Sequence, residues 1–90
     1  MYYHIRDAAC IKDYYVFLKF EDGLEGVVNL EKLAGQGEAF GPLTDMDYFC
    51  RMKLDERSHT IEWPNGADIC PEALYEVLKG APNHIATLEL

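Results

Sequence analysis

The sequence predicts an α+β domain in which an antiparallel sheet, built from hairpins, carries one main C-terminal helix on a face. Residues 14–20 are almost all β-branched or aromatic, and the Asp-Gly dipeptide at 22–23 that follows is a strong hairpin signal. Residues 50–55 alternate apolar and polar side chains, as a half-buried strand does. Residues 71–79 begin with Pro and are followed by Gly80, which is the usual punctuation of a helix.

The first hairpin joins a strand at 14–20 to a return strand at 24–30, and residues 3–11 supply a further strand beside them. Both faces of the first strand are largely apolar: one carries Tyr14, Val16, Leu18 and Phe20, and the other carries Tyr15, Phe17 and Lys19. This composition predicts a central strand that is covered on both sides. Gly26 in the return strand indicates a bulge or a close approach of another segment.

The middle of the chain is expected to be irregular, because Gly35, Gly37, Gly41 and Pro42 interrupt regular structure. A short helical turn follows at 45–49, with Thr44 or Asp45 as its N-cap.

The second hairpin is predicted to pair residues 50–55 with residues 60–63 across a polar turn. Cys50, Met52, Leu54, Ile61 and Trp63 are expected to face the core, and Arg51, Lys53, Asp55, Thr60 and Glu62 to face water. We expect this hairpin to lie in the same sheet as the first.

Residues 61–75 form the most informative stretch, since strand, turn and helix signals agree with one another there. The predicted structural signature consists of Trp63, Pro64, Asn65, Gly66, Asp68, Pro71, Leu74 and Tyr75. We expect the Asp68 side chain to accept local amide hydrogen bonds, so that the signature is structural rather than catalytic. In the helix that follows, Leu74, Val77 and Leu78 form an apolar stripe. Gly80 is expected to end this helix in the left-handed conformation.

Length and charge limit the classes of function. Ninety residues make one domain, 1–90, and the net charge of −8 comes from sixteen acidic and eight basic residues. This balance opposes direct binding to nucleic acid and to anionic membranes, and it suits a basic protein partner. No stretch approaches the roughly 20 apolar residues of a membrane helix, and no apolar run at the N-terminus indicates a signal peptide.

The cysteines are Cys10, Cys50 and Cys70, an odd number that we interpret as free thiols in a cytoplasmic protein. Cys70 is the candidate reactive thiol, because it falls at the N-cap of the predicted helix, where the helix dipole lowers the pKa of a thiol. The alternative is a tolerated substitution at a capping position.

Groups for other chemistry are few. His4, His59 and His84 lie on three different predicted elements without metal-ligand spacing, and the one serine, Ser58, has no partner positioned to activate it. The sequence therefore predicts no catalytic residue, no metal site and no cofactor.

Residues 84–90 have the composition of a strand and include Ile85, Leu88 and Leu90. These three are candidate interface residues, because a solvated tail does not need them. They can pair with the chain's own sheet, or they can add a strand to the sheet of a partner, in a homodimer or a heteromeric complex.

The segments 20–23, 26–30, 40–43, 61–69 and 71–75 resemble a family of small bacterial proteins, the domain-of-unknown-function family 2442. The Trp-Pro-Asn-Gly-x-Asp run at 63–68 is the most specific part of a resemblance that covers about residues 3–80. The resemblance implies an α+β domain with an antiparallel sheet and no agreed biochemical activity. Some relatives carry a helix-turn-helix domain, and some are suspected partners in toxin–antitoxin-like gene pairs. With residues 81–90 as the tail beyond this core, we expect no DNA-binding domain here.

These observations favour a non-enzymatic protein-interaction module, either antitoxin-like or an accessory subunit, that binds a protein partner or forms a homodimer. One alternative is a thiol-dependent sensor or enzyme that uses Cys70 at the helix N-terminus. Another is a small-molecule binding domain that uses the corner at Trp63.

Overall fold

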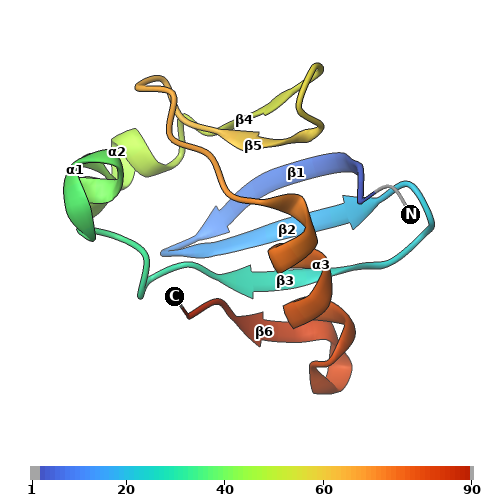
Figure 1. Ribbon diagram of the computed structural model, residues 1–90. Helices are drawn as coiled ribbons and strands as arrows, with labels where there is room; N and C mark the ends of the chain where they lie inside the picture. The colour runs from blue at the N-terminus through green and yellow to red at the C-terminus, as the bar shows by residue number, and fades with distance from the viewer. Residues whose placement is uncertain (1–2, 90) are drawn as a thin grey trace.

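Four strands form the main sheet in the computed structural model, which describes residues 3–89 (Figure 1). They are β1 (Ile5–Lys12), β2 (Tyr15–Phe20), β3 (Glu25–Asn29) and β6 (Ile85–Thr87), in the order β1-β2-β3-β6. The β1–β2 and β2–β3 pairs are antiparallel, and the β3–β6 pair is parallel. The predicted class, an α+β fold with a mostly antiparallel sheet and a C-terminal helix, is confirmed.

The predicted first hairpin is the β2–β3 pair, and its turn follows the local chemistry of the Asp-Gly dipeptide. Gly23 has a φ of 98°, a conformation that residues with a Cβ rarely adopt. Its amide donates to the carbonyl of Phe20 at 3.0 Å, and the Asp22 carboxylate accepts from the amide of Leu24 at 3.0 Å. The turn is therefore held by bonds within a few residues, which is why the sequence reveals it.

The predicted second hairpin forms, but it makes a separate sheet of two strands, β4 (Lys53–Asp55) and β5 (Thr60–Glu62). The expectation of one common sheet is wrong. The hairpin lies along β1 (Figure 1), to which the amide of Ile5 connects it by donating to the His59 carbonyl at 3.0 Å. Pairing between β1 and β2 is interrupted by two register shifts, and such bulges bend a strand and turn it away from a further regular neighbour.

Two side-chain positions in this hairpin also differ from the prediction. Cys50 is exposed, because it follows α2 (Met46–Phe49) as its C-cap and lies outside β4. Thr60 is buried, and its hydroxyl donates to the carbonyl of Ile69 at 2.6 Å, which satisfies the polar atom inside the core. Ile61 and Trp63 point inward as predicted, and Leu54 is half-buried.

The middle of the chain is more regular than expected. It contains α1 (Gly37–Phe40), a 3₁₀ helix η1 (Gly41–Thr44) and α2. Gly37 begins α1 with a φ of 64°, so this glycine redirects the chain at the start of a helix instead of preventing one. Asp45 is the N-cap of α2, as one of the two predicted alternatives, and accepts from the Asp47 amide at 3.0 Å.

Helix α3 (Pro71–Lys79) has the predicted bounds and lies across one face of the main sheet (Figure 1). Leu74 and Leu78 are completely buried there. Gly80 does not take the left-handed conformation, since its φ is −84°. Asn83 and His84 do, with φ of 58° and 54°, in the 3₁₀ helix η2 (Pro82–His84) that turns the chain into β6.

At Gly26 another segment lies close to β3, which is one of the two alternatives predicted for this glycine. A Cβ at this position would lie 2.3 Å from the carbonyl oxygen of His84 and 2.6 Å from a methyl carbon of Leu78. Both distances are far below van der Waals contact, so only glycine lets α3 and η2 lie this close to β3. The contact also identifies the face of β3 that α3 covers.

Candidate functional site

The Trp-Pro-Asn-Gly corner connects β5 to α3 and is anchored by Trp63. The Trp63 indole donates to the carbonyl of Phe49 at 2.8 Å, and its backbone amide donates to Ala67 at 2.8 Å. Gly66, with a φ of 88°, donates back to Trp63 at 2.9 Å and closes the turn. Asn65 contributes its side chain: the amide group donates to Ala39 at 2.9 Å, and its oxygen accepts from Ala67 at 3.0 Å.

Asn65, and not Asp68, therefore supplies the local side-chain hydrogen bonds that were expected of Asp68. Asp68 is exposed and takes part through a backbone bridge with Glu62. The side-chain oxygen of Asn or Asp can accept a hydrogen bond from the backbone amide two residues later. The residue types alone therefore do not decide whether Asn65 or Asp68 makes this bond. In the structure, these hydrogen bonds hold the corner in place.

Tyr75 connects α3 to the β2–β3 turn. Its hydroxyl donates to the carboxylate of Asp22 at 2.5 Å, and its ring packs edge-on against Phe20 with the centroids 5.0 Å apart. This hydrogen bond is the main reason that the pKa of Asp22 is lowered and the pKa of Tyr75 is raised. Leu74 lies in the core next to it, and Pro71 begins the helix.

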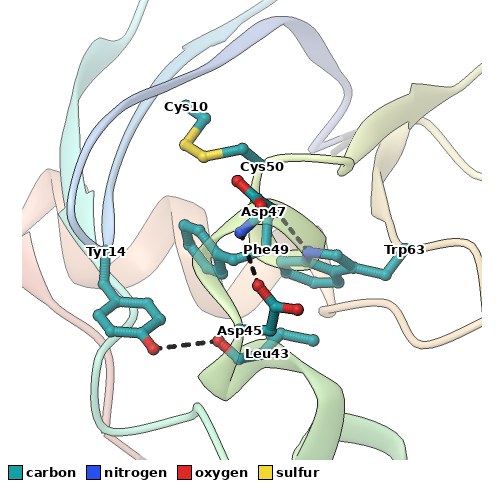
Figure 2. Close-up of a disulfide and its surroundings, with 8 residues drawn as sticks. All are labelled: Cys10, Tyr14, Leu43, Asp45, Asp47, Phe49, Cys50 and Trp63. Carbon is teal, nitrogen blue, oxygen red and sulfur yellow. Dashed lines mark hydrogen bonds between the residues drawn. A yellow bond between two sulfur atoms is a disulfide. The ribbon is translucent and has the colours of Figure 1, made fainter.

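A disulfide joins Cys10 in β1 to Cys50 at the end of α2, with the two Cα atoms 5.5 Å apart. The expectation of three free thiols is therefore wrong for these two cysteines. A separation of 40 residues gave no local signal for the pairing. Figure 2 shows the bond above Phe49, whose ring lies between those of Tyr14 and Trp63. The centroid of the Phe49 ring is 4.9 Å from that of Tyr14 and 5.9 Å from that of Trp63. The disulfide thus connects the edge of the main sheet to the aromatic residues under the corner.

Cys70 is free and exposed, and it is the N-cap of α3, as predicted. Its side chain makes no capping hydrogen bond. The position therefore has the exposure that a reactive thiol needs, and it also lacks the capping that Ser would provide.

Two of the histidines, His4 and His59, are in contact, although all three were predicted to lie on different elements. The rings of His4 and His59 stack with their centroids 3.9 Å apart, and the His4 Nδ1 lies 3.3 Å from a Glu21 carboxylate oxygen. Within residues 3–89, no group of three or more His, Cys, Asp or Glu side chains is arranged to hold a metal ion. In the same residues, no helix combines the length and the apolar character needed to cross a membrane.

The predicted interface residues of the tail have different environments. β6 pairs with the chain's own β3, so the first of the two predicted alternatives describes the tail in this structure. Leu88 is 5% exposed and belongs to the core, whereas Ile85 is 60% exposed. Leu90 lies outside the described residues.

The face of the main sheet opposite α3 is the largest feature that the sequence did not predict, and we call it the open face. A row of apolar side chains crosses it in register: Ala9 pairs with Phe17, Phe17 with Val27, and Val27 with Ile85. These positions alternate along each strand with the buried ones, so they point away from the core. The prediction that β2 is covered on both sides is therefore wrong for the described residues.

Two polar rows flank this apolar row on the open face. One consists of Asp7, Lys19 and Glu25, and the other consists of Lys12, Tyr15, Asn29 and Thr87. Ile11 stands beside the second row, in the bulge between Cys10 and Lys12.

Exposed apolar residues concentrate on the open face. Among residues 3–89 the exposed large hydrophobic side chains are Ile11 at 56%, Tyr15 at 39% and Ile85 at 60%. Tyr15 and Ile85 occupy register positions of the open face, and Ile11 lies in the bulge beside Lys12, opposite Tyr15. Contiguous apolar surface on a soluble domain is typical of a protein-binding site. The sequence indicated this surface through the second apolar side of residues 14–20. That side was predicted to be covered by the chain itself.

The fold and this surface define a small α+β domain whose sheet is covered by its own helix on one face only. The chain belongs to the DUF2442 family, described as proteins of unknown function, whose family model matches residues 5–80. The comparisons with curated proteins and with solved structures gave no match.

Proposed function

We propose that the protein is a non-enzymatic protein-interaction module that binds a protein partner or a second copy through the open face. The observation that carries this proposal is the gathering of Ile11, Tyr15 and Ile85 on one face of the main sheet. Burial of such side chains in a complex is favourable by about 25 cal/mol for each Å² of apolar surface removed from water.

An antitoxin-like or accessory role is the form of this function that we favour. It rests on the resemblance to a family with suspected members in toxin–antitoxin-like gene pairs. The net charge of −8 belongs to the whole chain; it favours long-range attraction to a basic protein, whatever the charge of the binding face, and it opposes direct binding to nucleic acid and to anionic membranes.

The test is affinity purification of the tagged chain from its native host, with co-purifying proteins identified by mass spectrometry. Three forms are compared: wild type, the double variant Ile11→Glu/Ile85→Glu on the open face, and Ala39→Glu, an exposed control position in α1. A partner should be present with wild type and with the control, and absent with the double variant. The same set of proteins with all three forms would contradict a role for the open face.

The antitoxin-like role has a separate test. The products of genes adjacent to this one are expressed singly and together with the chain. Arrest of growth by a neighbouring product, relieved by wild type but not by the double variant, is the expected result. Relief by both forms would place the protective contact outside the open face.

A thiol-dependent sensor or enzyme is the second candidate, because Cys70 is free and exposed at the start of α3. It predicts rapid reaction of Cys70 with a thiol probe well below pH 8, at which an ordinary thiol with a pKa of about 8.5 is mostly protonated.

We also propose that the protein works in the cytoplasm. The exposed free thiol of Cys70 supports this location, because such a group is prone to unwanted pairing where disulfides form readily. The Cys10–Cys50 bond opposes it, because disulfides are rare in the cytosol. Fractionation of cells that produce the chain at its native level tests this location. Recovery of the chain from the secreted fraction would contradict it.

A further inference from the structure

We infer that the open face binds the open face of a second copy of this chain, so that two main sheets pack face to face about a two-fold axis. The inference rests on the proposed function, since it assumes that this face binds protein, and it names the partner. It differs from the addition of an edge strand, because no backbone ladder is shared between the copies.

The charge on the open face is the first argument for a second copy. The face carries two acidic residues, Asp7 and Glu25, and three basic residues, Lys12, Lys19 and Arg6, the last in the bulge between Ile5 and Asp7. The whole chain carries sixteen acidic and eight basic residues, so the open face lacks the acidic excess of the rest of the molecule. A surface matched to a basic partner would be acidic, and a surface without that excess lets two acidic chains approach each other.

The second argument is that the face is complementary to itself. A closed dimer presents the same surface from both subunits, so acidic positions must fall opposite basic or polar ones after a two-fold rotation. Two sheets packed face to face lie about 10 Å apart, with their strands rotated by about 30°. The direction of the two-fold axis then decides which row of one subunit lies opposite which row of the other.

A two-fold axis along the apolar row, across the strands, exchanges the two polar rows. Asp7 then faces Lys12 of the partner subunit, and Lys12 faces Asp7 of the partner subunit. Lys19 comes to lie over the Tyr15 ring of the partner subunit, an arrangement that favours a cation–π contact.

A two-fold axis along the strands reverses the order of the strands instead. Lys19 then faces Glu25 of the partner subunit, and the larger Phe17 lies opposite the smaller Val27 of the partner subunit. Ala9 similarly lies opposite Ile85 of the partner subunit, so large side chains again meet small ones. The axis along the strands brings no two like charges together, which is the property expected of a homodimer surface. The axis across the strands also brings Arg6 near Lys12 of the partner subunit, so the charges favour the axis along the strands.

Sedimentation velocity and light scattering on the full chain test the dimer over a range of concentrations. Wild type and the control Ala39→Glu should form dimers. The double variant Ile11→Glu/Ile85→Glu should dissociate at least about 30-fold more readily, because it buries two carboxylates in the contact, one on each outer strand of the sheet. Both substituted positions are more than half exposed, at 56% and 60%, so the variant should keep the wild-type circular dichroism spectrum, and the wild-type melting temperature at concentrations where both proteins are monomeric.

Charge exchange then identifies the axis. If the axis runs across the strands, Asp7→Lys weakens the dimer and the pair Asp7→Lys/Lys12→Asp restores it. If the axis runs along the strands, Lys19→Glu weakens the dimer and the pair Lys19→Glu/Glu25→Lys restores it. Lys19 also lies 3.9 Å from Glu25 of its own chain, so melting at concentrations where the chain is monomeric measures the share of the effect that comes from that contact. A dimer in which neither pair shows this loss and rescue would overturn the face-to-face arrangement.

A wild-type chain that stays monomeric at every concentration, or a dimer that the Ile11→Glu/Ile85→Glu variant leaves intact, would overturn the inference. The proposed function would survive a monomeric result if the co-purification experiment still found a different protein that only the double variant loses. If the chain neither forms a dimer nor co-purifies with a protein that the double variant loses, the proposed function is rejected as well.

Discussion

The two faces of the main sheet have similar side chains and opposite environments. On the covered face, Val16, Leu18 and Val28 are completely buried under α3 and the rest of the core. On the open face, Phe17 and Val27 are half-buried and Ile85 is 60% exposed. The alternation of strand side chains assigns each residue to a face, but it does not say whether the chain supplies a second layer for that face.

The difference teaches that a strand with two apolar sides has two physical meanings. It can lie at the centre of a single chain's core, or it can have one side reserved for a partner. Residues 3–89 place α3 on one face of the sheet and leave Tyr15 and Ile85 exposed on the other. Substitutions on the covered face should therefore lower the free energy of unfolding more than substitutions on the open face.

Leu74→Ala should lower the free energy of unfolding by about 2–4 kcal/mol, because Leu74 is completely buried on the covered side. Ile85→Ala on the open face should lower it by less than about 0.5 kcal/mol at concentrations where the chain is monomeric. Urea denaturation measures both values. Equal losses for the two variants would mean that the chain itself packs against the open face.

Gly26→Ala should lower the free energy of unfolding by about 3 kcal/mol, since its Cβ would overlap the His84 carbonyl oxygen at 2.3 Å. The backbone of η2 is the obstacle, so a change of rotamer cannot relieve it. Gly41→Ala is the matched control, because nothing lies within 4 Å of its added Cβ and Gly41 has ordinary helical dihedrals. Thermal melting that gives both variants the wild-type midpoint would disprove the close packing of η2 on β3.

Asn65→Ala should lower the free energy of unfolding by about 1–2 kcal/mol, because it removes the hydrogen bonds with Ala39 and Ala67 at the corner that leads into α3. Asp68→Ala, three residues later and exposed, should change it by less than about 0.5 kcal/mol. Chemical denaturation of the two variants side by side measures this contrast. If Asp68→Ala leaves stability unchanged but abolishes binding to a partner, the corner belongs to an interface and not only to the fold.

Cys70→Ser should raise the free energy of unfolding by a few tenths to about 1 kcal/mol, since Ser caps a helix better than Cys does. Thermal melting under non-reducing conditions keeps the Cys10–Cys50 bond intact in both proteins. The same samples test the thiol sensor: under the interaction function, Cys70 reacts with a probe at pH 7 as slowly as free cysteine. Much faster labelling would favour the sensor instead.

The Tyr75–Asp22 hydrogen bond should make the stability of the covered side depend on acid pH. The folded-state pKa of Asp22 is lowered below its ordinary value of 3.8, chiefly by the hydrogen bond from Tyr75. The stabilisation is therefore present above pH 3.8 and is lost as the pH falls through the lowered value. Melting temperatures of wild type and Asp22→Asn should differ at neutral pH and converge in acid; a constant difference would show that this carboxylate does not contribute.

Several elements could be predicted from the sequence because each depends on neighbours in the chain. The bounds of α3 follow from Pro71 at its start and an apolar stripe of helical spacing, and they match at 71–79. The β2–β3 turn follows from Asp22 and Gly23, and the N-cap of α2 follows from Asp45. Each of these depends on hydrogen bonds or dihedral angles within about four residues, so the residue types alone are enough to specify it.

Only the tertiary structure decided the features that join distant segments. The pairing of β6 with β3, the disulfide between Cys10 and Cys50, and the separation of β4–β5 from the main sheet each depend on which segments meet after the chain closes long loops. The open face is a feature of the same kind. The sequence established that residues 14–20 have two apolar sides. Only the folded structure decided that α3 packs on the side of Gly26, which leaves Phe17, Val27 and Ile85 on the opposite face.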